Sequence, residues 1–217
     1  MQFKIEGLEA IEGPDHRVTV HKLADGSRLP IATPPTRDGT IPEETHAAAA
    51  PVRQAANAFA ALEKARRDVA KDLTLSDFGR EQKVKGAREA AQRSIGEAET
   101  QLAQLEATTV GLRDQAFAPP KLESADLANA LIDQEVRTYV RGLSPAERTE
   151  YLSTLKANPR HLEALLRSPV PIPVISEHAN RLWAEKHQNS AAAVKAQGYA
   201  AAIEWARGTL RSIRSKV

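Results

Sequence analysis

Six histidines are the side chains of this sequence best suited to bind a metal ion or to transfer protons. No two of them stand four residues apart on an expected helix, and no His-Glu-x-x-His motif is present. The chain has no cysteine, which excludes disulfides, thiolate chemistry and cysteine-based zinc sites. We therefore expect neither a metal site nor a cofactor. The six positions are His16, His21, His46, His161, His178 and His187.

Motifs for nucleophilic or phosphate chemistry are also missing from the sequence. There is no Gly-x-Ser-x-Gly elbow and no glycine-rich phosphate loop, and Ser144 is better explained as a helix cap. The acidic pairs Glu43-Glu44 and Glu97/Glu99 lie in solvated contexts rather than in an apolar pocket. The expectation is a protein without enzymatic activity.

Basic residues cluster at the C-terminal end, at Arg207, Arg211, Arg214 and Lys216. The three arginines share one helical face, which suits contact with phosphate groups or with an acidic partner. The alternative, which we favour, is that these charges complement the C-terminal dipole of the last helix. The net charge of +2, from 30 basic and 28 acidic residues, argues against general nucleic-acid binding.

The longest regular pattern predicts a coiled-coil-like helix over residues 84–116. Its apolar positions alternate steps of three and four: Val84, Arg88, Ala91, Ile95, Ala98, Leu102, Leu105, Thr109, Leu112 and Ala116. A second stripe runs from Val52 to Leu73, and cap residues 74–77 separate the two. We predict a long antiparallel αα-hairpin over 51–118. Its alanine-rich stripes pack thinly, so the hairpin needs a further element, and a third stripe from Ala192 to Ile213 is the candidate.

Residues 1–33 are predicted to form a small β-hairpin arm with alternating apolar residues. Asp25-Gly26 predicts the turn, with both residues at positive φ, and Pro30 predicts an edge strand. The arm either docks on a partner or covers the core of its own chain. Its candidate docking residues are Phe3, Ile5, Val18, Val20 and Ile31. A proline-rich linker over 34–50 follows.

Residues 121–217 are predicted to form a C-terminal helical bundle. Ser124 is a candidate cap, Ser144-Pro145-Ala146-Glu147 forms a capping box, Ser176 caps the last helices, and residues 188–190 break them. Residues 168–173 form an extended, proline-rich strap that wraps its own domain or meets a partner. Its candidate partner-binding residues, with the residue that follows it, are Val170, Ile172 and Val174.

These expectations combine into a mainly α protein: a long hairpin, a C-terminal bundle and an N-terminal β arm. Aromatic residues make up only 4% of the chain, as is typical of long helices rather than of a thick globular core. The first residues lack the apolar core of a signal peptide, and no apolar run approaches the ~20 residues of a membrane span. We expect a soluble protein.

Three segments within 75–170 resemble small helical proteins of tailed-phage and prophage morphogenesis clusters. They are the helix start at 75–83 with the Ala/Glu/Gln-rich helix after it, the capping box at 143–148, and the short helix at 162–166. The resemblance implies a role in a virion or its assembly, and it carries no catalytic residues. The N-terminal arm and the final helix lie outside it.

The leading hypothesis is a structural protein of a phage particle, made in the bacterial cytoplasm. It would be a capsid, neck or portal-associated component that contacts other particle proteins and copies of itself. An assembly scaffold or chaperone is the second hypothesis. A nucleic-acid-associated factor using the basic C-terminal helix is the third.

Overall fold

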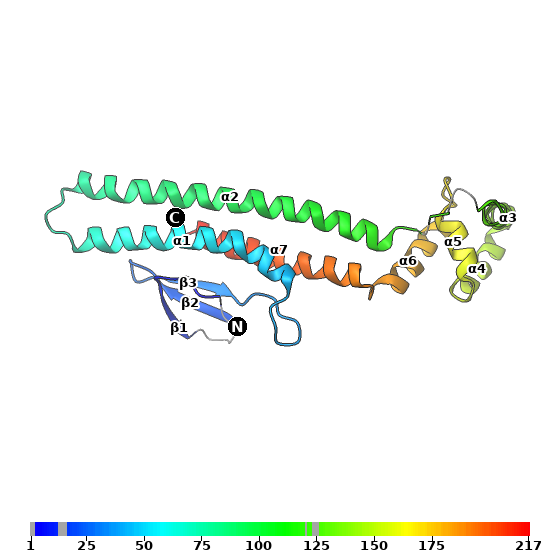
Figure 1. The fold of residues 1–217 in the computed structure, drawn as a ribbon, viewed down its shortest axis with the longest axis horizontal. Coiled ribbons are helices and arrows are strands. Elements are labelled where there is room, and N and C mark those ends of the chain that lie inside the picture. The colour runs from blue at the N-terminus through cyan, green and yellow to red at the C-terminus, as the bar shows by residue number, and fades with distance from the viewer. Residues whose placement is uncertain (1–2, 13–16, 120, 123–125) are drawn as a thin grey trace. The chain divides into compact units, whose positions relative to one another are not determined.

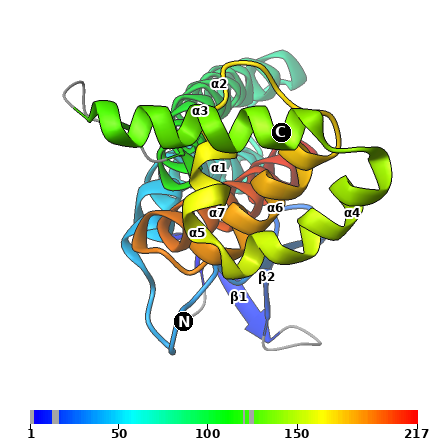
Figure 2. The same cartoon turned by 90° about the vertical axis from the view of Figure 1, so that its right-hand side faces the viewer.

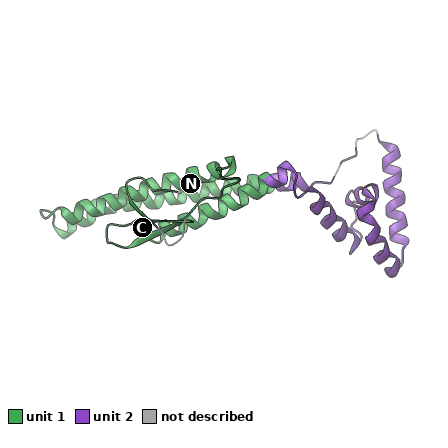
Figure 3. Cartoon of the chain, turned by 90° about the horizontal axis from the view of Figure 1, so that it is seen from below, with its two compact units in different colours: residues 1–111, 195–217 green, residues 112–194 purple. Residues whose placement is uncertain are grey.

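The computed structural model describes residues 3–12, 17–119, 121–122 and 126–217. The chain divides into two compact units, coloured separately in Figure 3. Unit 1 comprises residues 1–111 and 195–217, and unit 2 comprises residues 112–194. Residues 195–217, which include most of the last helix, therefore group with the N-terminal half of the chain, whereas the prediction from the sequence grouped them with the C-terminal bundle.

Unit 1 contains a three-stranded antiparallel sheet in the order β1 (Glu9–Glu12), β2 (Val18–Lys22), β3 (Arg28–Ala32). Pro30 lies on the edge strand, as predicted, where its missing N–H is tolerated. The predicted turn forms, but only Gly26 has a positive φ, of 80°; Asp25 instead accepts a hydrogen bond from the Ser27 N–H (2.8 Å). Phe3 and Ile5 lie outside the strands, and β1 begins beyond Gly7.

Two long helices, α1 (Glu43–Lys71) and α2 (Asp77–Phe117), pack together as the predicted hairpin (Figure 1). Ser76 caps α2 by accepting a hydrogen bond from the Gly79 N–H (3.2 Å). The expected linker over 34–50 is partly helical, because α1 begins at Glu43. Pro42 precedes its first turn, and Pro51 lies inside the helix, where a proline removes one backbone hydrogen bond.

The core of unit 1 has three helical contributors. The middle of the α2 stripe is buried, whereas Arg88 near its start is exposed. Helix α7 (Ala191–Arg214) packs against the hairpin and supplies the third stripe. The main residues of this core are Val52, Ala55, Phe59 and Leu62 from α1, Ala91, Ile95, Ala98 and Leu102 from α2, and Ala206, Leu210 and Ile213 from α7.

The N-terminal segment and sheet cover this core. Phe3, Ile5, Val20 and Ile31 are buried, and only Val18 of the candidate docking residues in this arm is half-buried. The Phe3 and Trp205 rings meet edge to face with centroids 5.4 Å apart, and the Trp205 indole N–H donates to the Ala32 carbonyl (2.8 Å). The arm therefore covers its own chain, which was the alternative to docking on a partner.

A buried carboxylate joins three segments of the chain: the turn between β2 and β3, helix α1 and the C-terminal residues. Glu63 accepts a hydrogen bond from the Ala24 N–H (2.6 Å) and pairs with Arg66 (2.7 Å). Arg66 also donates to the carbonyls of Lys216 (2.9 Å) and Val217 (3.2 Å). Segments far apart in the sequence thus share one polar contact.

Unit 2 contains α3 (Leu127–Gly142), α4 (Pro145–Thr154), the 3-10 turn η1 (Leu155–Ala157), α5 (Pro159–Leu166) and α6 (Ile175–His187). Helix α5 packs against both α3 and α6 (Figure 2). The Ser144–Glu147 capping box forms as predicted. The central buried residues of this unit are Val136, Val140, Leu155, Leu162, Leu165, Ile172, Ile175 and Ala179.

Of two further helix caps predicted in unit 2, one lies outside the described residues and the other is wrong. Ser124 lies outside the described residues, and Asp126 caps α3 by accepting from the Asn129 N–H (3.2 Å). Ser176 does not cap α6, which begins at Ile175; its hydroxyl instead accepts a hydrogen bond from the Ile172 N–H (2.8 Å). The predicted break at 188–190 separates α6 from α7. No helix in the described part of the chain is both long and apolar enough to cross a membrane.

Replacing Glu63 tests the contact between the β2–β3 turn and helix α1. Glu63→Ala leaves the Ala24 N–H and Arg66 without their carboxylate partner. We expect the free energy of unfolding to fall by about 2 kcal/mol, less than for a fully enclosed pair because Arg66 keeps contact with water. Urea unfolding followed by circular dichroism measures the change. The exposed Glu89→Ala is the matched control, and an equal effect in both variants would contradict the assignment.

Candidate interaction face on helix α3

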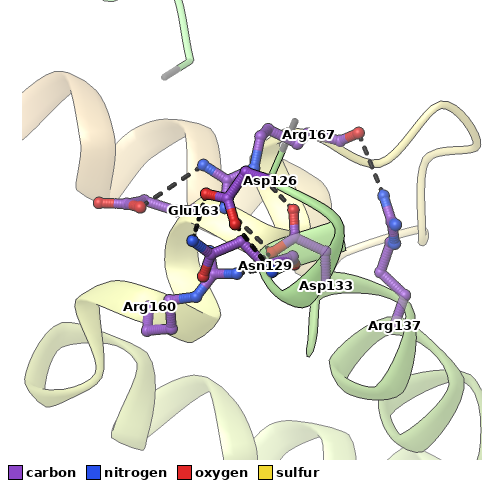
Figure 4. Close-up of polar contacts among 7 residues, drawn as sticks. All are labelled: Asp126, Asn129, Asp133, Arg137, Arg160, Glu163 and Arg167. Atoms are coloured by element: carbon purple, nitrogen blue, oxygen red, sulfur yellow. Dashed lines mark hydrogen bonds and ion pairs between the residues drawn. The ribbon is translucent and has the colours of Figure 1, made fainter. Parts of the chain in front are cut away.

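Unit 2 is organised around a carboxylate enclosed by arginines. Asp133 of α3 is fully buried, and Figure 4 shows the side chains that converge on it. Arg167 donates from Nε to Oδ2 (2.7 Å) and from Nη2 to Oδ1 (3.0 Å), which is a bidentate pair. Arg160 lies 2.7 Å from Oδ1. Both arginines come from the α5 region, so Asp133 ties α3 to α5.

Further polar contacts surround this pair (Figure 4). Arg160 also donates to the Asn129 carbonyl (2.8 Å), and Arg137 donates to the Arg167 carbonyl (3.2 Å). Asn129 donates from its side-chain amide to the Asp126 carboxylate. Burial alone would raise the pKa of Asp133, but the Arg167 hydrogen bond and the positive charges of Arg167, Arg160 and Arg137 together hold it below its ordinary value.

The Asp133 cluster fixes which side of α3 faces inward. Successive residues turn by about 100°, so Asp133, Val136 and Val140 share one side of the helix, and all three are buried. Other apolar residues of α3 point away from this side. We call these exposed residues the α3 face: Leu127 (74% exposed), Leu131 (62%), Ile132 (41%) and Tyr139 (60%). The apolar residues of α3 therefore divide between a buried side, with Val136 and Val140, and this exposed face.

Tyr139 of the α3 face rests against an aromatic support. Its ring meets the Tyr151 ring edge to face, with centroids 6.0 Å apart. The buried Tyr151 hydroxyl shares a hydrogen bond of 2.9 Å with Nδ1 of His161, and burial raises the pKa of Tyr151 to about 12. A supported aromatic ring loses little rotamer freedom on binding, which favours its use as an interface anchor.

The predicted strap residues divide between core and surface. Ile172 is buried in unit 2, whereas Val170 and Val174 are exposed at 60% and 63%. The Val170 carbonyl accepts hydrogen bonds from Arg141 (3.5 Å) and Ser168 (2.7 Å). The strap therefore wraps its own unit and leaves two valines outward.

The predicted basic cluster is largely engaged within unit 1. Arg207 forms two hydrogen bonds with the Glu106 carboxylate (2.6 and 3.0 Å), and Arg214 pairs with Glu99 (2.8 Å). Lys216 lies 3.5 Å from the Ser27 hydroxyl. Arg207 and Arg214 therefore connect α7 to α2. Neither the phosphate interpretation nor the helix-dipole interpretation predicted these ion pairs. The Arg207 hydrogen bond lowers the pKa of Glu106.

Arg211 is the remaining member of the predicted basic cluster. It is exposed, and it lines a shallow depression with Glu99, Arg207 and Leu210. No group of three or more histidine or carboxylate side chains within the described ranges could hold a metal ion. A depression in unit 2 has a volume of about 510 Å³ and a mixed lining that includes Lys156, Leu162 and Glu185.

The Asp133 cluster was not predicted from the sequence. One local feature pointed to it: an aspartate shares an otherwise apolar helix side with Val136 and Val140. A buried carboxylate requires a cationic partner. The identity of that partner depends on the tertiary packing, because Arg160 and Arg167 lie in a later helix region.

Comparisons with protein-family models, with curated proteins and with solved structures each find no match to this chain.

The pKa of Asp133 gives a test of the cluster. Because folding lowers this pKa, the ion pair stabilises unit 2 at pH values above the ordinary aspartate pKa of about 3.9. The stabilisation is lost as the pH falls through the pKa of Asp133 in the folded state. Asp133→Asn should lower the free energy of unfolding by about 3 kcal/mol at pH 7, and by much less near pH 2.

Each unit carries one tryptophan, so the emission of Trp183 in a Trp205→Phe background reports unit 2 during urea unfolding. The exposed Glu135→Gln on the same helix is the control. A loss from Asp133→Asn that is equally large at both pH values would contradict the charge assignment.

Proposed function

We propose that this chain is a non-enzymatic structural protein of a phage particle, a capsid, neck or portal-associated component that works in multiple copies. The observation that carries the proposal is the α3 face. A helix that keeps large apolar side chains outward, while a buried ion cluster fixes its orientation, is typical of an interaction surface.

A second copy of the chain is the occupant that we propose for the α3 face. A two-fold symmetric contact uses the same patch on both copies, and about 800 Å² from each is enough for a stable interface. The α3 face suits this contact because its apolar side chains extend along the exposed half of the helix, from Leu127 near one end to Tyr139 near the other. In an antiparallel pairing, two copies would present this side to each other.

The particle assignment rests on the resemblance of residues 75–170 to tailed-phage morphogenesis proteins. The elements that carry this resemblance are the capped start of α2, the capping box before α4 and the short α5. A nucleic-acid role for the C-terminal helix is less favoured, because Arg207 and Arg214 already have carboxylate partners.

Light scattering during size-exclusion chromatography tests the contact between copies. We expect the wild-type chain to form dimers or larger multimers as its concentration rises. Leu131→Glu places a charge in the apolar interface and should yield monomers, with at least a tenfold higher dissociation constant. The control Ala146→Glu adds the same charge at an exposed position at the start of α4. A wild-type protein that stays monomeric at high concentration would overturn the self-contact.

Mass spectrometry tests the particle assignment separately. Phage particles purified from the strain that encodes the chain should contain it at a fixed stoichiometry. Presence in precursor particles only would favour the scaffold alternative, and absence from both would overturn the proposal. Neither outcome depends on the effect of Leu131→Glu.

A further inference from the structure

His21 occupies an unusual position for an ionisable side chain. It lies in β2 and is fully buried; no described side chain pairs with either ring nitrogen, and its polar contact is the Phe3 backbone, at a geometry short of a full hydrogen bond. Its neighbour on β3 is Leu29, which is also buried. Thr19, two residues earlier on the same face, is buried with an unpartnered hydroxyl. The imidazole therefore sits in a largely apolar environment between sheet and helices.

Among the side chains that the structure describes, the charged groups near His21 offer no anionic partner to its protonated form. Lys4, in the segment before β1, is a like charge. On α1, Glu63 is already engaged by the Ala24 N–H and by Arg66. Beyond α7, Lys216 reaches Ser27 in the hairpin turn. Helix α7 contributes the uncharged Trp205 to the sheet contact.

We propose that His21 is an acid-sensitive latch that holds the N-terminal sheet on the helices of unit 1. An imidazolium ion cannot stay buried without a partner at acceptable cost, so protonation requires the sheet to separate and admit water. The separated state exposes Phe3, Ile5, Leu29 and Ile31, together with the helix surface that they cover. At neutral pH this apolar surface is closed.

The sign of the pH dependence follows from the surroundings of the ring. Burial lowers the pKa of His21 below the ordinary 6.5, the Phe3 backbone opposes this shift, and Lys4 adds to it. The folded state therefore binds a proton less readily than the open state does. The closed arrangement of the sheet is fully stable above about pH 6.5. Its stability falls as the pH decreases toward the pKa of His21 in the closed state.

The helices of unit 1 have contacts with one another that do not involve the sheet. A three-stranded sheet is marginal without a surface to pack on. Its polar links to the helices include the Trp205–Ala32 and Ala24–Glu63 hydrogen bonds and the Arg67–Gly7 contact (3.0 Å). The stripes of α1, α2 and α7 also pack directly against one another, so we expect most of the helical structure to remain when the sheet separates.

Trp205 fluorescence tests the latch in the full-length chain carrying Trp183→Phe. Between pH 8 and pH 4.5 we expect a cooperative red shift of emission with a midpoint below pH 6.5, while far-ultraviolet circular dichroism keeps most of its helical signal. His21→Leu should remove this transition or move its midpoint down by at least one pH unit. The exposed His46→Gln should leave it unchanged.

A transition with the same midpoint in His21→Leu would overturn the proposal. Nuclear magnetic resonance titration of the imidazole protons gives a second measurement that needs no altered core. The His21 resonance should not titrate while the sheet remains closed. Ordinary titration near pH 6.5 with the sheet resonances unchanged would equally overturn the latch.

Discussion

The thinness of the α2 stripe is the constraint on which unit 1 depends. Its most enclosed residues are two alanines, one isoleucine and one leucine, and such side chains bury little apolar area between two helices. The hairpin alone would therefore be marginal. The additional apolar area comes from two distant segments of the chain: α7 brings Leu210 and Ile213, and the N-terminal segment brings Phe3 and Ile5. The need for an additional layer was inferred correctly, but in unit 1 that layer comes from the same chain.

Buried carboxylates set the arrangement in both units. Glu63 joins the hairpin turn to α1, and Asp133 joins α3 to α5. An enclosed ion pair gains little net stability over apolar packing, since desolvation offsets most of its attraction. It does disfavour alternative packings, because any rotation of the helix leaves a charge buried without a partner. Both carboxylates therefore act chiefly by selecting one packing arrangement of their helices. The apolar pattern of each helix alone would permit several orientations.

Features that local chemistry determines were predictable from the sequence. The start and end of α2, the Ser76 cap, the capping box at Ser144, the edge position of Pro30 and the break before α7 all depend on neighbouring residues. The early start of α1 was missed because a proline-rich segment suggests a linker even where Pro42 precedes a helix.

Features that depend on distant partners could not be inferred from the pattern. Alternating apolar residues show that the N-terminal arm has a buried side, but they do not show what buries it. The partners of Arg207 and Arg214 lie about a hundred residues away in α2, so a basic stripe in the sequence becomes a set of ion pairs in the structure. The Asp133 cluster went unnoticed for the same reason.

The division of α3 into two apolar sides connects the fold of unit 2 to function. The apolar residues of α3 taken alone would also fit a helix buried on all sides. Asp133 excludes that arrangement, because a buried carboxylate with two arginines from the α5 region fixes one side inward and leaves Leu127 and Leu131 outside. Burying those leucines by turning the helix would expose Val136 and Val140 and separate the ion pairs. Covering the α3 face without dismantling unit 2 therefore takes a surface from outside this unit.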